Sequence, residues 1–209
     1  PGLSPDARIA TRGIVLPQVV GGSLDSLSVD SSSLTLTSKG QSNASVTLSD
    51  VDVDLSHISL HKPYQTDTVA ASGTISWQQV AELAAASHPK LKGVTLQAKR
   101  TGTSTQDPGA IQASMSLLGL SGEAEIVPSL GADGSLVLTI TSTRMGGNDL
   151  GVDVATGQDS MLSYIGLDSP QITIPAKSLP PGLRPTSAIV TNDGLRLSLA
   201  GSRVNLGQL

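Results

Sequence analysis

The sequence predicts an α+β fold that is mostly β, in which a highly curved antiparallel sheet wraps around one helix. Alternating apolar and polar residues recur from residue 24 to residue 199, as expected for strands that bury one face. Only Thr74–Pro89 has helical periodicity. The segment Ala44–Leu60 changes its alternation phase twice, and each change requires a kink or a bulge. These phase changes therefore predict strong curvature.

The predicted helix runs from Ser76 to His88. Ser76 is a good N-cap, and Gln79 follows it at capping-box spacing. Pro89 cannot continue the helix and disfavours helical geometry at His88. One face has apolar residues at helical spacing and becomes mostly alanine towards its end, where it permits either close packing or a gap. The apolar residues of this face are Trp77, Val80, Ala81, Leu83 and Ala84.

Strands are predicted on both sides of the helix. Before it they cover residues 24–36 and 44–60, and after it residues 94–98, 111–117, 124–126, 136–140, 172–174 and 195–199. Sequences typical of turns separate several of these strands, at residues 106–109 (QDPG), 132–134 (ADG) and 192–194 (NDG).

Three further segments have weaker patterns. Gly13–Gly22 is apolar with Pro17 in its centre, which predicts a bent or edge segment rather than a central strand. Asp6–Thr11 is expected to be the end of a helix. Thr156–Ile165 is expected to form a short helix, because Thr156 and Asp159 have capping-box spacing.

The composition excludes several classes of protein. At 209 residues and 21.2 kDa the chain has the length of one domain. Charged residues make up 14% and the net charge is -4, so neither disorder nor nucleic-acid binding is expected. With no Cys there is no disulfide, thiolate metal site or thiol catalysis. With no Phe, one Trp and two Tyr, the core must be almost wholly aliphatic.

The sequence has no motif that indicates catalysis or a metal site. G-x-S-x-G, G-x-G-x-x-G, G-K-[ST] and H-E-x-x-H are all missing. His57 and His61 have equal parity on a predicted strand, but a metal site needs three or four converging ligands. Asp50, Asp52 and Asp54 have the spacing that begins a calcium loop, but Leu55 stands where that loop needs Gly and His61 where it needs Glu. Their alternation with valines is that of the solvated face of a strand. We expect no enzyme, no metal and no cofactor.

The apolar residues allow a different kind of site. A curved sheet around an alanine-rich helix, in a chain without Phe, can leave an apolar void, and such a void suits an alkyl chain. A tail of about sixteen carbons would gain on the order of 12 kcal/mol before ordering costs. For any one residue, plain core packing is the simpler interpretation. The residues predicted to line a lipid-binding groove are Leu16, Val19, Trp77, Val80, Leu83, Ala84, Met115, Leu117, Met161 and Ile165.

Segments near both ends of the chain resemble one known family. Leu179–Leu206 (LPPGLRPTSAIVTNDGLRLSLAGSRVNL) resembles the closing hairpin of the LmeA-like family of actinobacterial envelope proteins. GIVLPQVVGGSLDSLSVDS, which starts at Gly13, resembles the opening motif of that family. The order between them also matches: a long strand pair, a helix that begins I-S-x-x-x-V, and G-E-A-x-I-V-P before an A-D-G turn.

The resemblance implies a phospholipid-binding protein with a tubular lipid-binding (TULIP, BPI-like) fold. It also implies a location outside the cytoplasm, in the periplasm or cell envelope, with export or anchoring through the N-terminus. Some members of the family are linked to assembly of mannose-containing lipoglycans. Gly13–Gln18 lacks the aromatic residue of the opening motif, and the family's N-terminal helix is missing or cut short. We expect one lipid-binding domain over residues 1–209 that lacks part of its native N-terminus.

The expected function is binding, and by extension transfer, of a phospholipid or related amphiphile in support of envelope lipid or lipoglycan assembly. The expected partners are a phospholipid or lipoglycan precursor and a membrane surface, and not nucleic acid. Two other classes stay open. A structural or adhesive β-module of the envelope would explain the composition, which is rich in Ser, Thr and Gly, without any cavity. A hydrolase of envelope lipids or glycans would need a nucleophile–base pair that the sequence does not show.

Overall fold

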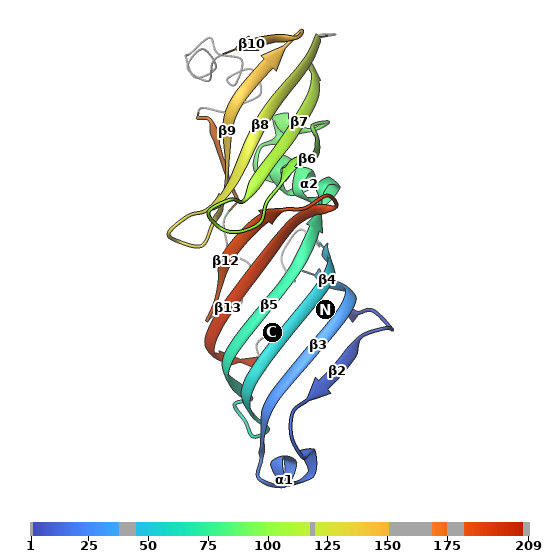
Figure 1. Cartoon of the computed structure of the whole chain (residues 1–209), viewed down its shortest axis with the longest axis vertical. Helices are drawn as coiled ribbons and strands as arrows, with labels where there is room; N and C mark the ends of the chain where they lie inside the picture. The colour runs from blue at the N-terminus through green and yellow to red at the C-terminus, as the bar shows by residue number, and fades with distance from the viewer. Residues whose placement is uncertain (1, 38–44, 118–119, 151–168, 175–181, 207–209) are drawn as a thin grey trace. The chain divides into compact units, whose positions relative to one another are not determined.

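The computed structural model describes residues 2–37, 45–117, 120–150, 169–174 and 182–206. The described strands form two sheets, and the strand pairs whose register is given are antiparallel. Two α-helices and one short 3₁₀ helix accompany them (Figure 1). The helices are α1 (Val15–Val20), α2 (Trp77–Ser87) and η1 (Pro89–Leu91).

The first sheet has the order β1-β3-β4-β5-β13-β12, and β2 also pairs with β3. Its strands are β1 (Gly2–Leu3), β2 (Arg8–Thr11), β3 (Ser23–Thr37), β4 (Ser45–Ser59), β5 (Gln65–Ser76), β12 (Leu183–Val190) and β13 (Gly194–Asn205). The second sheet has the order β10-β9-β8-β7-β6, and β11 also pairs with β9. Its strands are β6 (Thr95–Thr101), β7 (Gly109–Leu117), β8 (Leu120–Leu130), β9 (Leu136–Met145), β10 (Asn148–Leu150) and β11 (Gln171–Ile174).

The chain divides into two compact units. The first unit comprises residues 1–74, 177–186 and 197–209, and the second unit comprises residues 75–176 and 187–196. Helix α1 belongs to the first unit, whereas α2 and the second sheet belong to the second. The expectation of a single domain over residues 1–209 stays a prediction.

Helix α2 has the caps that the sequence predicts. The Ser76 Oγ accepts a hydrogen bond from the backbone N–H of Gln79 at 3.4 Å, and Pro89 begins η1 directly after the helix. Because α2 contacts β6 and β11, the second sheet is the one that covers it. The predicted fold class, a mostly β α+β fold with antiparallel strands, is confirmed.

Strand β4 contains both of the irregularities that its alternation phase predicts. Asp50 and His57 lie at the two phase changes, and both have left-handed backbone, with φ of 49° and 47°. The register against β3 is the same from Ser23↔Ser59 to Thr37↔Ser45, so no residue is inserted. The phase changes are therefore kinks rather than bulges, and β3 changes phase with its partner.

Two segments near the N-terminus contradict the prediction. Gly13–Gly22 contains helix α1 and is not a bent or edge segment. Pro17 is tolerated because it is the third residue of α1, and the first four N–H groups of a helix have no acceptor within it. Asp6–Thr11 is not a helix end either, since it contains β2, which pairs with β3. So short a segment forms no stable helix alone. Pairing with β3 provides hydrogen-bond partners for its backbone N–H and C=O groups instead.

The predicted turns lie where the sequence places them. Residues 106–109 connect β6 to the first residue of β7, residues 132–134 lie between β8 and β9, and residues 192–194 connect β12 to the first residue of β13. In the second of these turns the Asp133 carboxylate accepts hydrogen bonds from both the N–H and the hydroxyl of Ser135. These bonds lower the pKa of Asp133 below its usual value. The short helix predicted at Thr156–Ile165 lies outside the described residues.

Gly109, the first residue of β7, is expected to be far less tolerant of alanine than Gly93. Both have φ of +87°, but a Cβ on Gly109 would lie 2.5 Å from the Arg100 carbonyl and 2.6 Å from the Gly102 nitrogen. A Cβ on Gly93 would meet no atom within 4 Å. Gly93→Ala should therefore cost about 1–2 kcal/mol for its backbone alone, and Gly109→Ala clearly more. Urea unfolding measures both, and equal losses would contradict the packing argument.

Candidate functional site

The second sheet turns an aliphatic face towards α2. Successive side chains of a strand point to opposite faces, and the residues that face the helix include Leu96, Ala113, Ala124 and Leu138. Strand β9 continues this face through a bulge. Glu125 pairs with Ser142 and Ile126 with Ile140, so Thr141 is the extra residue. The bulge shifts the phase of β9, and Ile140 and Thr143 both face the helix.

Between α2 and this sheet lies a partly enclosed apolar cavity of about 70 Å³. All of its lining residues belong to the second unit. They come from α2, η1, the segment before β6, strands β6 to β9, and β11. The lining residues are Ala81, Ala84, Leu91, Val94, Leu96, Ala113, Ser114, Met115, Gly122, Glu123, Ala124, Ile126, Leu138, Ile140, Thr143 and Ile172.

The cavity exists because small residues from both layers meet. Ala113 of β7 pairs with Ala124 of β8, and Met115 pairs with Gly122 in the same hairpin. Ala81 and Ala84 contribute the helix side. Protein interiors are normally packed without gaps, and here short side chains stand on both sides of one space. Apolar cavities stay dry and can admit a hydrocarbon.

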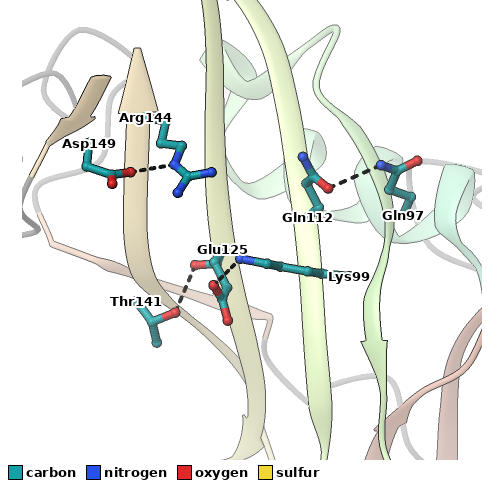
Figure 2. A network of polar contacts seen from close by, with 7 residues as sticks. All are labelled: Gln97, Lys99, Gln112, Glu125, Thr141, Arg144 and Asp149. Carbon is teal, nitrogen blue, oxygen red and sulfur yellow. Dashed lines mark hydrogen bonds and ion pairs between the residues drawn. The ribbon is translucent and has the colours of Figure 1, made fainter. Parts of the chain in front are cut away.

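The opposite face of the second sheet is a polar surface (Figure 2). Gln97 Nε2 donates to Gln112 Oε1 at 3.3 Å, and the Lys99 ammonium lies 2.5 Å from the Glu125 carboxylate. Thr141 Oγ1 donates to the Glu125 carbonyl at 3.3 Å. Gln97 and Lys99 of β6, Gln112 of β7 and Glu125 of β8 have the opposite parity to the cavity residues Leu96, Ala113 and Ala124 of the same strands. The sheet therefore has one apolar face for the helix and one polar face for water.

An exposed ion pair lies at the β9–β10 end of this polar surface. The Arg144 guanidinium donates a hydrogen bond to Asp149 and lowers the pKa of that carboxyl. The same hydrogen bond raises the pKa of Arg144. The two side chains are 56% and 74% exposed, so water screens their interaction. The shifted pKa values thus indicate a surface ion pair and not a proton-transfer site.

A second hollow, of about 340 Å³, lies in the first unit and is polar. The Asp6 carboxylate at its edge accepts hydrogen bonds from the hydroxyls of Ser4 and Ser32, which lower its pKa. This lining of carboxylates, one guanidinium and hydroxyls does not suit an alkyl chain. The residues that line the hollow are Asp6, Arg8, Asp30, Ser31, Ser32, Asp50, Val51 and Asp52.

Two of the predicted groove residues, Ala84 and Met115, line the apolar cavity. Trp77 and Val80 are buried on α2, and Leu83 is half-buried there, but none of these three contributes to the lining. The Trp77 Nε1–H donates to the backbone carbonyl of residue 192 at 3.0 Å. Trp77 therefore fixes the start of α2 to the β12–β13 turn.

The other predicted groove residues are not brought to this cavity by the described structure. Leu16 and Val19 lie in α1 of the first unit and are exposed. Leu117 is in β7, but its side chain is outside the described part of the structure. Met161 and Ile165 lie outside the described residues. Their part in a groove stays a prediction.

Sequence reasoning missed most of the cavity wall. Ala113, Ala124 and Leu138 were predicted on strands but not assigned to a site, because alternation does not show which strands face the helix. The signal that could have found them is the hairpin register. Strands joined by a short turn pair directly, and that pairing sets Ala113 opposite Ala124.

The part of the chain that the structure describes has neither a candidate metal site nor a helix that could span a membrane. That part contains no group of three His, Cys, Asp or Glu residues that could hold a metal ion. None of its helices is long and apolar enough to cross a bilayer.

The comparison with protein families agrees with an apolar site. A family model described as LmeA-like phospholipid-binding matches residues 4–200. The chain therefore belongs to the LmeA-like phospholipid-binding family, and the resemblance found in its sequence is confirmed. The family is one of lipid-binding proteins rather than a known class of enzymes. No match was found among curated proteins or among solved structures.

Proposed function

We propose that this protein binds a phospholipid or a related amphiphile, with part of an acyl chain in the apolar cavity between α2 and the second sheet. The observation that carries the proposal is the cavity itself. It is lined mostly by aliphatic and alanine side chains, in a chain that belongs to a phospholipid-binding family. A hydrocarbon chain is the part of a phospholipid that matches such a lining.

The size of the cavity decides how much of the lipid it takes. Its volume of about 70 Å³ exceeds the roughly 10–15 Å³ that one water needs. It is smaller than the roughly 300–1,000 Å³ of pockets that enclose a whole small ligand. The space therefore suits a segment of one chain, and each buried methylene group contributes about 0.8 kcal/mol. The headgroup and the rest of the lipid stay outside the cavity.

The proposal extends to the place and purpose of binding. The protein acts outside the cytoplasm, in the periplasm or cell envelope, and presents or transfers its lipid at a membrane surface for lipid or lipoglycan assembly. Support comes from the resemblance of Leu179–Leu206 and of the motif at Gly13 to envelope proteins. A lipoglycan precursor with a phospholipid anchor would offer the same acyl chains to the cavity.

Lipid analysis of the purified protein tests the proposal. Protein prepared without detergent is extracted with organic solvent and analysed by mass spectrometry, and delipidated protein is incubated with vesicles and isolated again. The expected result is a phospholipid in the extract and uptake of lipid from the vesicles. An extract without lipid, together with no uptake, would contradict the proposal and favour a structural β-module with no ligand.

A further inference from the structure

Helix α1 and the residue before it expose aliphatic side chains over most of the helix surface. Ile14, Leu16 and Val20 are 76%, 74% and 82% exposed, and Val15 and Val19 are exposed as well. None of the residues of α1 is buried, and no acidic residue in its first turn or basic residue in its last turn interrupts the apolar surface. A contiguous apolar surface of this kind marks a contact with another protein or with a membrane.

Hydrogen bonds at its base hold α1 in this position. The Gln18 side chain donates to the Arg12 carbonyl at 2.9 Å and accepts from the backbone N–H of Asp25 at 2.9 Å. At the other end, the Gly22 carbonyl accepts from the Leu60 N–H at 2.9 Å. Figure 1 shows α1 beyond the ends of β2 and β3, at one end of the first unit's sheet. The exposed apolar residues are therefore a fixed projection.

Two positively charged residues, Arg12 and Lys62, lie beside this projection. Arg12 precedes α1 and is exposed. The His61 imidazole lies against Gly22, where a Cβ atom would come within 2.0 Å of its Nε2, and Lys62 follows it. Asp25 is also close and carries the opposite charge. In a chain with a net charge of -4, this end has a local excess of basic groups, which favours an anionic partner.

We propose that α1 is a membrane-contacting tip, which inserts Ile14, Leu16 and Val20 among the headgroups and upper acyl segments of a phospholipid bilayer. Arg12 and Lys62 then face the phosphate groups, where a basic residue strengthens attachment to anionic lipid. Tyr64, in the same turn as Lys62, is 42% exposed, and tyrosine favours the boundary between lipid and water. The proposal rests on the proposed function for the nature of its partner.

The distribution of the apolar residues favours a bilayer over a protein groove. A helix that docks in a groove presents one stripe, at positions i, i+3, i+4 and i+7. The aliphatic residues of α1 are instead exposed on every side except that of the half-buried Gln18, and a bilayer surrounds an inserted tip on all of its free sides. Lipid headgroups also provide the anionic partner that Arg12 and Lys62 require.

Vesicle co-sedimentation of the double variant Ile14→Glu, Val20→Glu tests whether α1 contacts a membrane; both side chains are highly exposed, and neither residue is a predicted groove residue. The vesicles are pure phosphatidylcholine, or phosphatidylcholine mixed with phosphatidylglycerol. The double variant should bind both at least about tenfold more weakly, because losing about two buried methylene groups already has that effect. Wild-type binding to the mixed vesicles should be the stronger and should weaken with added salt.

Leu3→Glu is the matched control. Leu3 is an exposed aliphatic residue of the same unit, 47% exposed, and pairs with Leu34. At about 3.3 Å per residue along β3, Leu34 lies roughly 36 Å from Ser23, where α1 joins the strand. Leu3→Glu should bind vesicles as the wild type does. Circular dichroism checks that the variants are folded, which we expect because the changed side chains are exposed.

Two results would contradict the proposal that α1 contacts a membrane. One is vesicle binding by the double variant equal to that of Leu3→Glu. The other is a wild-type dimer that becomes monomeric in the double variant with vesicle binding unchanged, since α1 would then be a contact between copies of the chain.

Binding of a soluble fluorescent fatty acid, measured without vesicles, distinguishes the function of the tip from that of the cavity. Loss of vesicle binding with unchanged probe binding supports the tip. If the wild type fails to bind the probe, that result contradicts only the proposed lipid binding in the cavity and leaves the membrane-contacting tip untouched.

Discussion

Replacing Ala84 with leucine is expected to weaken binding of a fatty-acid probe by about tenfold or more, since excluding only two methylene groups costs about 1.6 kcal/mol. Ala84 is 6% exposed and lines the apolar cavity from the α2 side. The larger side chain would occupy the space that we assign to the acyl chain. The melting temperature should stay the same or rise, because leucine fills an existing cavity. Fluorescence titration and a thermal melt measure the two effects.

Ala86→Leu is the control for this prediction. Ala86 lies on the same helix, two positions further on, but is exposed. The same chemical change there adds apolar surface to α2 without touching the cavity. Ala86→Leu should therefore bind the probe like the wild type. Equal affinity of the Ala84→Leu and Ala86→Leu proteins would show that the cavity is not the binding site.

Replacing Trp77 with alanine is expected to destabilise the protein by about 3–5 kcal/mol, the usual range for removing a large buried aromatic side chain. Trp77 is 9% exposed at the first turn of α2, and its indole N–H donates to the carbonyl of residue 192 at 3.0 Å. Alanine would leave a cavity there and remove the donor to that carbonyl. Against a typical stability of roughly 5–15 kcal/mol, this loss is large. Urea unfolding followed by far-UV circular dichroism measures it.

The Trp77→Phe variant separates the two causes of this destabilisation, the loss of ring packing and the loss of the hydrogen-bond donor. Phenylalanine keeps most of the apolar contact but has no N–H, so the acceptor at residue 192 loses its donor. That loss alone should cost about 1–3 kcal/mol. A Trp77→Ala protein as stable as the Trp77→Phe protein would mean that packing of the ring contributes little to holding α2 in place.

Rules that use only neighbouring residues correctly predicted the elements that depend on neighbouring residues. Ser76 and Pro89 mark the ends of α2 because capping and proline geometry depend on a few neighbouring residues. The phase changes in β4 required two kinks, and Asp50 and His57 provide them with left-handed backbone. Asparagine and aspartate with glycine predicted the β12–β13 turn for the same reason.

Local rules failed where pairing between residues distant in sequence determines the local structure. Asp6–Thr11 has no strong pattern of its own, and β3 makes it a strand. Pro17 suggested an interrupted strand, although a proline in the first turn of a helix loses no hydrogen bond. The cavity wall depends on Ala113 meeting Ala124 in a hairpin and on both facing Ala84. No window of sequence around any one of them contains that information.

The position of Trp77 gives the protein a natural optical probe. It is the one tryptophan of the chain, and it belongs to the second unit. Indole emission during unfolding consequently reports that unit alone, while the ellipticity signal follows the strands of both. Coincident transitions in the two signals are what a single cooperative domain must show, and separated transitions would mean that the two units melt independently.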